Sequence, residues 1–186
     1  MNDNQQSLAK KHNRDAWNRM VVGKKRFTKP AKDEDLHQPL DTVDAIGWLG
    51  GNIAGKQVLC LAAGGGRQSA IYAATGAQVT VVDISPAMLE LDREVAAERG
   101  LDIRVVETSM DDLAMFPNEA FDIVIHPVST CYLPSITKVF SEVARVTQPQ
   151  GLYISQHKQP TSLQTDMTRS ANGYELIEPY YRTGPL

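Results

Sequence analysis

Continuous apolar runs of strand length mark two segments in the middle of the chain. Residues 57–63 (QVLCLAA) and 78–85 (QVTVVDIS) have the pattern of strands that are buried on both faces of a parallel sheet. Three glycines follow the first run, and residues 67–75 then predict a short helix that Gly76 ends. We expect the segment to form one β-loop-α-β unit with a right-handed crossover.

The same alternation continues along the chain. Ser85 and Pro86 are typical of a helix start, and Gly100 ends the helix that they predict. Residues 134–145 place apolar side chains on one helical face. Further strands are expected at 103–109, 121–128 and, opened by Gly151, 152–156.

Five strands that alternate with helices predict an α/β fold, a doubly wound and mostly parallel sheet with helices on both faces. Sheets of this kind bind ligands beyond the carboxyl ends of their strands. Those ends are expected in loops 62–67, 83–88, 109–113 and 126–132.

The N-terminal part has weaker signals. Residues 1–14 are polar and have no period, so little regular structure is expected there, and five Lys or Arg follow within residues 23–32. We interpret residues 1–38 as a flexible segment or a lid, with a solvated basic loop as the alternative. Apolar spacing from Asp41 to Leu49 predicts a helix that Gly50 and Gly51 end.

Composition limits the classes of function. With 186 residues, 42% of them hydrophobic, the chain can bury one core, and a net charge of −3 gives no general attraction to nucleic acid. No apolar run predicts a membrane span or a secretory signal, so a cytoplasmic protein is expected. Cys60 and Cys131 stand far apart and the histidines form no ligand pair, so no metal site is predicted.

The glycine run predicts the main binding site. Gly64, Gly65 and Gly66 separate a buried strand from a helix, where a ligand could approach backbone N–H groups. Asp83 ends the next strand, where a carboxylate can accept hydrogen bonds from a ribose diol. Alone, the glycines could form a tight turn and the aspartate a helix cap. Together they indicate an adenosine-type cofactor.

Three ordered motifs, VLCLAAGGG at 58–66, VVDISPAML at 81–89 and RVTQPQG at 145–151, make the chain from 57 to 156 resemble class I S-adenosylmethionine-dependent methyltransferases. The resemblance implies a Rossmann-like methyltransferase fold and S-adenosyl-L-methionine as cofactor, with S-adenosyl-L-homocysteine as product. It also implies methyl transfer to an acceptor, for which a small molecule is expected. We predict a cofactor-binding methyltransferase core at 39–160 and a C-terminal extension at 161–186. The extension could also be the truncated end of a longer protein.

The resemblance also implies roles for single residues. Ala62, Ala63, Gly64, Gly65 and Gly66 would line the methionine and ribose parts of the cofactor, and Asp83 would bind the ribose. Ile84 and Met88 would flank the adenine, whose edge Ser109, Met110 and Asp111 would read. His126, Pro127 and Val128 would face the transferring methyl group. Gln68 would either reach the cofactor carboxylate or face solvent.

The chain departs from the family pattern at four positions and at its end. Cys60 and Ser109 replace acidic residues, and Ala62 and Gln150 replace glycines. The family sheet normally closes with two more strands, whereas here one strand-like run, 174–181, follows the fifth.

Methyl transfer by direct displacement needs alignment and exclusion of water more than reactive side chains. No catalytic residue is therefore assigned. His126 is the best-placed candidate base, with a simple hydrogen bond at a strand end as the alternative, and Tyr132 and Asp112 are further candidates. A non-catalytic sensor or scaffold that binds S-adenosylmethionine is the alternative function. A nicotinamide-dependent reductase is disfavoured because Ser69 occupies the third position of a G-x-G-x-x-G fingerprint.

Overall fold

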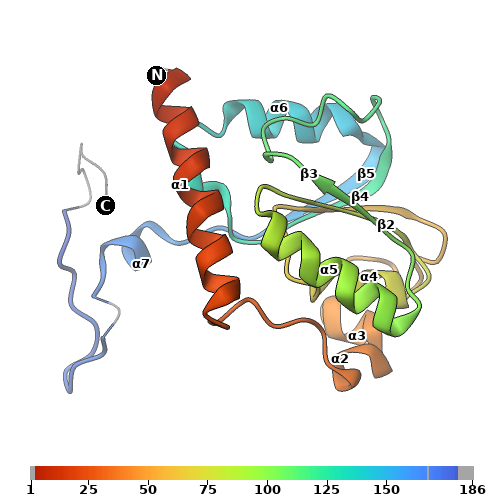
Figure 1. Cartoon of the computed structure of the whole chain (residues 1–186), viewed down its shortest axis with the longest axis horizontal. Helices are drawn as coiled ribbons and strands as arrows, with labels where there is room; N and C mark the ends of the chain where they lie inside the picture. The colour runs from red at the N-terminus through yellow and green to blue at the C-terminus, as the bar shows by residue number, and fades with distance from the viewer. Residues whose placement is uncertain (1–2, 167, 180–186) are drawn as a thin grey trace.

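A five-stranded sheet forms the centre of the chain in our computed structural model, which describes residues 3–166 and 168–179 (Figure 1). The strand order is β3-β2-β1-β4-β5, and all four pairings are parallel. The predicted doubly wound α/β fold is therefore confirmed. The strands are β1 (Gln57–Leu61), β2 (Gln78–Asp83), β3 (Ile103–Glu107), β4 (Phe121–His126) and β5 (Thr147–Ser155).

Helices cover both faces of the sheet. One face carries α4 (Gln68–Ala74) and α5 (Pro86–Arg99), with α2 (Asp33–His37) and α3 (Pro39–Val43) packed against α4. The other face carries α6 (Thr137–Val146). The remaining helices are α1 (Asp3–Val22), the 3-10 turn η1 (Thr130–Tyr132) and α7 (Pro160–Gln164).

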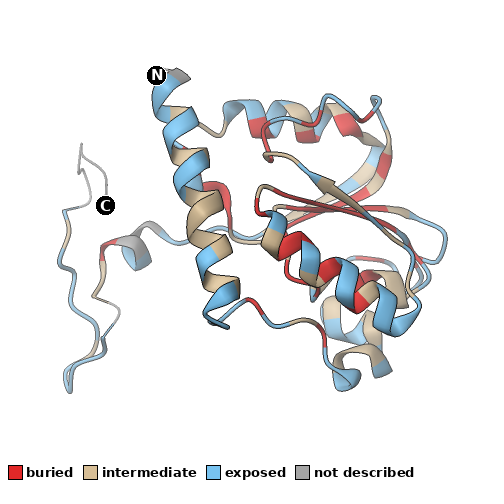
Figure 2. Cartoon of the chain, viewed as in Figure 1, coloured by how far each residue is buried: buried red, intermediate tan, exposed pale blue. Residues whose placement is uncertain are grey.

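The side chains of β1 alternate between the two faces of the sheet, and this explains why helices must cover both faces. Val58 and Cys60 belong to the apolar cluster beneath α4, whereas Leu59 and Leu61 belong to the cluster beneath α6. All four side chains are fully buried. Figure 2 shows the same concentration of buried positions in the strands and on the sheet-facing side of α5.

The helix α5 begins and ends as its sequence predicts. The Ser85 hydroxyl accepts a hydrogen bond from the Met88 N–H at 3.1 Å, and Pro86 occupies the first turn. Gly100 ends the helix with a φ of 62°, a left-handed conformation that glycine adopts without steric cost.

Two N-terminal predictions are wrong. Residues 3–14, expected to lack regular structure, form most of α1, because polar side chains along this helix bind loops far away in sequence. The helix predicted from Asp41 ends at Val43. A turn replaces it, in which the Asp44 carboxylate accepts a hydrogen bond from the Leu49 N–H and Gly47 has a φ of 76°.

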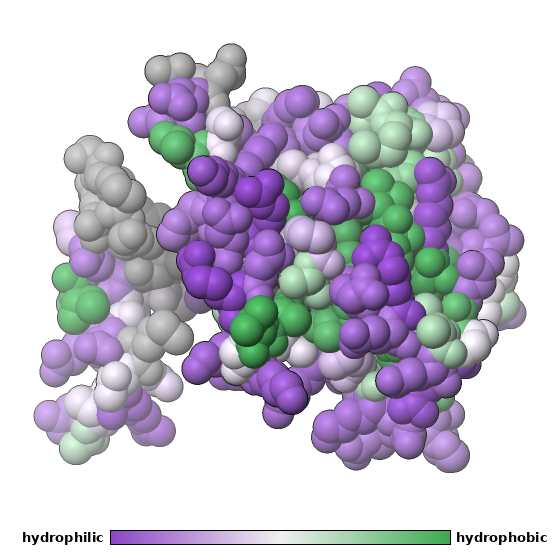
Figure 3. Space-filling view, viewed as in Figure 1, coloured by the Kyte–Doolittle hydropathy of each residue, from purple (hydrophilic) through white to green (hydrophobic). Residues whose placement is uncertain are grey.

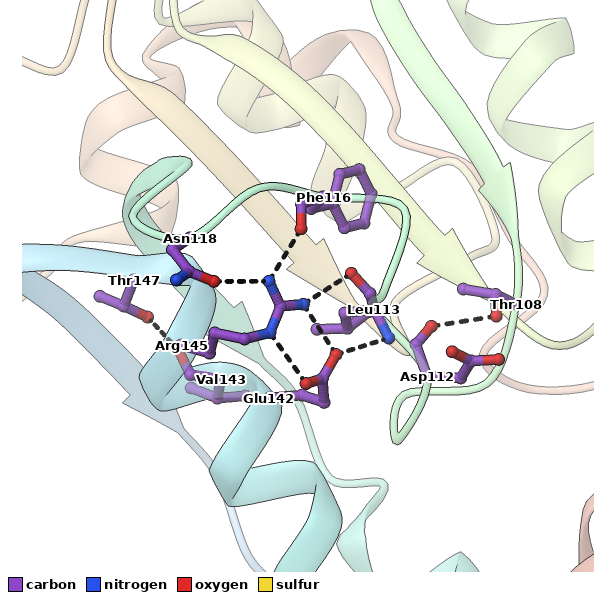
Figure 4. A network of polar contacts seen from close by, with 9 residues as sticks. All are labelled: Thr108, Asp112, Leu113, Phe116, Asn118, Glu142, Val143, Arg145 and Thr147. Atoms are coloured by element: carbon purple, nitrogen blue, oxygen red, sulfur yellow. Dashed lines mark hydrogen bonds and ion pairs between the residues drawn. The ribbon is translucent and has the colours of Figure 1, made fainter.

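The alternation of strands and helices breaks between β3 and β4. Residues 108–120 contain turns only, and Leu113 and Phe116 pack directly into the cluster beneath α6. Arg145 donates hydrogen bonds to the carbonyls of both residues at 2.8 Å and pairs with Glu142 (Figure 4). This network holds the loop without a helix.

The C-terminal part also differs from the sequence-based expectation. The strand β5 begins at Thr147 and not at Gly151, and the short helix α7 lies at the predicted border between the core and the C-terminal extension. Residues 174–179 of the predicted strand-like run form no strand, although Leu176 forms an isolated bridge with Thr165. Residues 180 and 181 lie outside the described part of the chain. No described helix is long and apolar enough to cross a bilayer.

Candidate functional site

The glycine loop lies at the point where the strand order reverses. The sheet continues from β1 to β2 on one side and to β4 on the other, and loop 62–67 leaves the carboxyl end of β1 between them. A Cβ atom on Gly64 would lie 2.9 Å from Met88 Cβ, and one on Gly66 would lie 2.6 Å from the Leu91 carbonyl. Contact with α5 therefore requires glycine at both positions.

The N–H groups of the three glycines point into the protein. Gly64 donates to Asp83 Oδ2 at 3.0 Å, and Gly65 and Gly66 donate to the two carboxylate oxygens of Asp92 at 2.9 and 3.1 Å. The expectation that these amides face a ligand is therefore wrong. The remaining backbone polar groups of these three glycines are carbonyl oxygens, and that of Gly66 accepts a hydrogen bond from the Ala31 N–H.

Asp83 is buried at the end of β2. Besides Gly64, the backbone N–H of Ser85 donates to it at 2.9 Å, and Ile84 adds a third backbone hydrogen bond. Burial raises the pKa of this carboxyl group, and the three amides oppose that rise. A carboxylate has about four lone-pair positions, so roughly one is left for a ligand hydroxyl.

Asp92 is a site residue that sequence reasoning missed. It is fully buried on α5, and besides the two glycine amides the Ser69 hydroxyl donates to it. Burial raises its pKa to about 6, although these three hydrogen bonds act in the opposite direction. An acidic residue within an apolar helical stripe, here between Met88 and Val95, is the sequence signal that could have identified it.

Other predicted residues surround the loop. The Gln68 Oε1 atom is buried and has no hydrogen-bond partner among the described residues. Met88 is buried behind Gly64, and Ile84 is half-buried. Ala62, which stands in place of a family glycine, has a φ of 48°, in the left-handed region that glycine normally occupies.

The loop after β3 brings Ser109, Met110 and Asp111 together. Met110 is buried, and Asp111 accepts a hydrogen bond from the Ser109 hydroxyl at 2.5 Å. Lys10 of α1 forms an ion pair with Asp111 at 2.7 Å. Burial alone would raise the pKa of Asp111, but Lys10 and the hydrogen bonds from Ser109 and Gln6 hold it below its usual value.

The helix α1 contacts the loops that follow β2, β3 and β4. The amide oxygen of Asn18 accepts a hydrogen bond from the Ser85 hydroxyl at 2.7 Å, and Asn13 donates to the Tyr132 carbonyl at 2.6 Å. The Trp17 and Tyr132 rings meet edge to face, with centroids 6.0 Å apart. The outward face of α1 is mainly hydrophilic (Figure 3). This helix therefore binds three of the four candidate loops, mainly through polar contacts.

His126, at the end of β4, is fully enclosed. Its Nδ1 lies 2.8 Å from the Tyr153 hydroxyl and its Nε2 lies 2.7 Å from the Ser129 hydroxyl. Both ring nitrogens are therefore engaged by hydroxyl groups, whichever of them carries the proton. Burial, with a smaller contribution from His157, lowers the pKa of His126 to about 4. The neutral ring has no nitrogen free to act as a base.

The other candidates are more accessible. Pro127 and Val128 are half-buried, and the side chains of Tyr132 and Asp112 are exposed. The Asp112 carboxylate makes no contact in the network of Figure 4, where its backbone carbonyl accepts a hydrogen bond from Thr108. His157, which sequence reasoning did not select, is exposed and lies within hydrogen-bond distance of the Thr130 and Ser155 hydroxyls.

Hollows elsewhere on the molecule do not coincide with these loops. One of about 470 Å³ is lined by 118–119, 144–145 and 147–149, and one of about 350 Å³ by 38–41, 51–53 and Thr75. Both lie toward the amino ends of the strands. Within residues 3–166 and 168–179, no three His, Cys, Asp or Glu side chains cluster in a way that could hold a metal ion.

Comparison with known proteins identifies similar chains. Residues 59–155 match the protein family described as "Methyltransferase domain". The uncharacterized methyltransferase YbaJ of Bacillus subtilis is 37% identical over 155 residues, which cover 77% of this chain and 60% of that protein. The ubiquinone biosynthesis O-methyltransferase of Xanthomonas oryzae pv. oryzae is 31% identical over 105 residues, or 56% of this chain and 44% of that protein.

Among solved structures, the PH0226 protein from Pyrococcus horikoshii matches with a TM-score of 0.59 at 26% identity. The match covers 73% of this chain and 64% of that one. The chain therefore spans less than two thirds of the length of each of these three proteins.

Proposed function

The chain belongs to the methyltransferase domain family, and on this premise we propose that it binds S-adenosylmethionine at the glycine loop and transfers the methyl group to a small-molecule acceptor. In this proposal, loop 62–66 holds the methionine and ribose parts of the cofactor. Asp83 accepts a hydrogen bond from a ribose hydroxyl, and Ile84 and Met88 flank the adenine. Residues 109–111 read the adenine edge.

The observation that carries the proposal is the orientation of the glycine amides. A pyrophosphate binds at a helix N-terminus through free N–H groups, but here Asp83 and Asp92 accept all three glycine N–H groups. Two buried carboxylates beneath the loop also disfavour an anion and favour a cation. S-adenosylmethionine carries a sulfonium and an ammonium group, so this arrangement supports it over a nicotinamide dinucleotide.

Gln68 provides a second test of fit. Its buried Oε1 atom accepts no hydrogen bond from the described residues, and a buried amide oxygen without a partner is costly. An ammonium group beside the loop would donate to it. The residues of this site therefore fit the amino-acid part of S-adenosylmethionine, and Gln68 would bind its ammonium group.

When bound, S-adenosylmethionine supplies an electrophilic methyl group on a positively charged sulfur atom. The chain then has to align the acceptor with that methyl group and exclude water. The contacts of α1 with Ser85, Asp111 and Tyr132 close this edge of the sheet. Because both nitrogens of His126 are occupied, an acceptor that needs deprotonation would use the exposed imidazole of His157 or arrive already ionised.

The name of one relative suggests the class of acceptor. The Xanthomonas protein is an O-methyltransferase, which supports an oxygen nucleophile for this chain as well. A non-catalytic sensor or scaffold that binds S-adenosylmethionine is the second candidate, and the enclosure of His126 favours it, since the best-placed base of the sequence is not accessible.

Isothermal titration of the purified chain with S-adenosylmethionine, S-adenosylhomocysteine and NADH tests the cofactor. We expect saturable binding of the first two alone, and binding of NADH instead would contradict the proposal. Incubation with methyl-labelled S-adenosylmethionine and a panel of phenols and other hydroxyl acceptors then separates the two functions. Label transfer supports the methyltransferase, whereas cofactor binding without transfer to any member of the panel supports the sensor.

A further inference from the structure

We propose that the buried carboxylate of Asp92 makes the glycine loop prefer S-adenosylmethionine over S-adenosylhomocysteine, a role that rests on the cofactor proposed above. Asp92 would then be a specificity-determining residue that acts through the loop backbone and does not touch the ligand. The argument depends on its burial, its partners and the charges around it.

Asp92 is a buried carboxylate without a cationic partner. Its hydrogen-bond donors are the Gly65 and Gly66 amides and the Ser69 hydroxyl. None of the ion pairs between described residues includes it. Burying a carboxylate without a counter-charge is costly, so the ligand-free protein holds unfavourable electrostatic energy at this point.

The titratable neighbours of Asp92 increase this cost. Asp83 at the end of β2 and Cys60 in β1 interact with it electrostatically, and neither can carry a positive charge. The helix α4 contributes only the Ser69 hydroxyl. Two acidic groups therefore lie beneath one glycine loop, and a positive charge placed on the loop would relieve the repulsion between them.

The cofactor and its product differ in this property. Both carry an ammonium and a carboxylate group, but the sulfur atom is positive in S-adenosylmethionine and neutral in S-adenosylhomocysteine. Since only the thickness of the loop backbone separates Asp92 from a ligand on the loop, water and salt screen its charge little. The charge should therefore strengthen binding of the cofactor more than binding of the product.

The substitution Asp92→Asn tests this role, because it removes the charge and nearly preserves the shape. We expect the dissociation constant of S-adenosylmethionine to rise about tenfold and that of S-adenosylhomocysteine about threefold or less, measured by calorimetry at pH 7.5. Ser69→Ala removes one hydrogen bond to Asp92 and keeps the charge of Asp92, so it should weaken the binding of both ligands equally. Glu94→Gln removes an exposed charge from the same helix and should change neither.

The ratio of the two dissociation constants separates the outcomes. If Asp92→Asn weakens binding of both ligands equally, Asp92 has only a structural role and the proposal is overturned. Unchanged binding of both ligands would also overturn it. If the unchanged protein binds neither ligand, the proposed cofactor itself is contradicted.

Proton linkage tests the same role in the unchanged protein, should Asp92→Asn fail to fold. A cation on the loop lowers the pKa of Asp92, so binding near pH 6 should release protons, and S-adenosylmethionine should release more than S-adenosylhomocysteine. Titration in two buffers of different ionisation enthalpy measures this release. Equal release for both ligands would contradict the proposal.

Discussion

The ammonium group of Lys10 lies 2.7 Å from the Asp111 carboxylate, and this contact joins the N-terminal helix to the loop after β3. The Asp111 side chain is only 3% exposed and that of Lys10 is 26% exposed, so the pair is shielded from solvent on one side. Removing one partner of such a pair leaves the other charge buried without compensation. The contact is therefore a main attachment of α1.

Replacing Lys10 by Met should loosen α1. We expect the free energy of unfolding to fall by about 1–3 kcal/mol and proteolytic cleavage near residues 22–30 to become faster. Lys11→Met is the matched control, because the neighbouring Lys11 is exposed and makes no ion pair in the described structure. Equal cleavage rates for the two variants would contradict this role. If α1 acts as a lid, S-adenosylhomocysteine should also slow cleavage of the unchanged protein.

Replacing Asp83 by Ala should weaken binding of S-adenosylhomocysteine about tenfold or more, because a hydrogen bond to a charged group and the anchor of Gly64 are lost together. Glu107→Ala is the control, since Glu107 pairs with Asp83 in the strand register and is exposed. Calorimetry measures both affinities. Unchanged affinity in Asp83→Ala would refute the ribose role.

His126 should make stability depend on pH. Its pKa in the folded chain, about 4, lies below the ordinary value of 6.5, so its contribution is present above pH 6.5 and is lost as the pH falls through 4. The contribution is about 3–4 kcal/mol, since one pKa unit corresponds to about 1.4 kcal/mol. In denaturant titrations between pH 7 and 4, the His126→Gln variant should not show this loss of unfolding free energy. The His157→Gln variant, which changes an exposed side chain, should still show it. Identical pH profiles for the unchanged protein and His126→Gln would contradict the burial of a neutral ring.

Replacing Gln150 by Gly should stabilise the protein. The Gln150 φ of 65° lies in the left-handed region, which costs a residue with a side chain roughly 1–2 kcal/mol. Gln150→Gly removes that cost but gives the unfolded chain more freedom, so a net gain of about 0.5–1 kcal/mol is expected. Thermal unfolding measures it. Gln148→Gly, two residues earlier at a position without a positive φ, should destabilise the protein, and the same sign for both changes would contradict the explanation.

The sequence predicts the β1-α4-β2-α5 unit well, because its signals are local. Buried parallel strands have nearly continuous apolar runs, Ser85 caps its own helix and Gly100 ends it. Ala62 and Gln150 follow the same logic, since both depart from family glycines and both have a positive φ. Backbone conformation at these points depends on neighbouring residues and can be inferred from them.

Long-range polar contacts could not be predicted in this way. Gln6, Lys10, Asn13 and Trp17 lie on one face of α1 at helical spacing, but the face is largely polar, so a search for apolar periodicity overlooks it. The N–H groups of Gly65 and Gly66 point into the protein because they donate hydrogen bonds to Asp92, which lies in helix α5. Such partners become apparent only when the chain is folded.

The attachment of α1 also has a consequence for biosynthesis. This helix is translated before its partners Ser85, Asp111 and Tyr132. At about 5–20 residues per second, the nascent helix waits several seconds or longer for them. Because isolated polar helices are marginally stable in water, this helix should acquire its native structure only after the sheet that follows it in the chain.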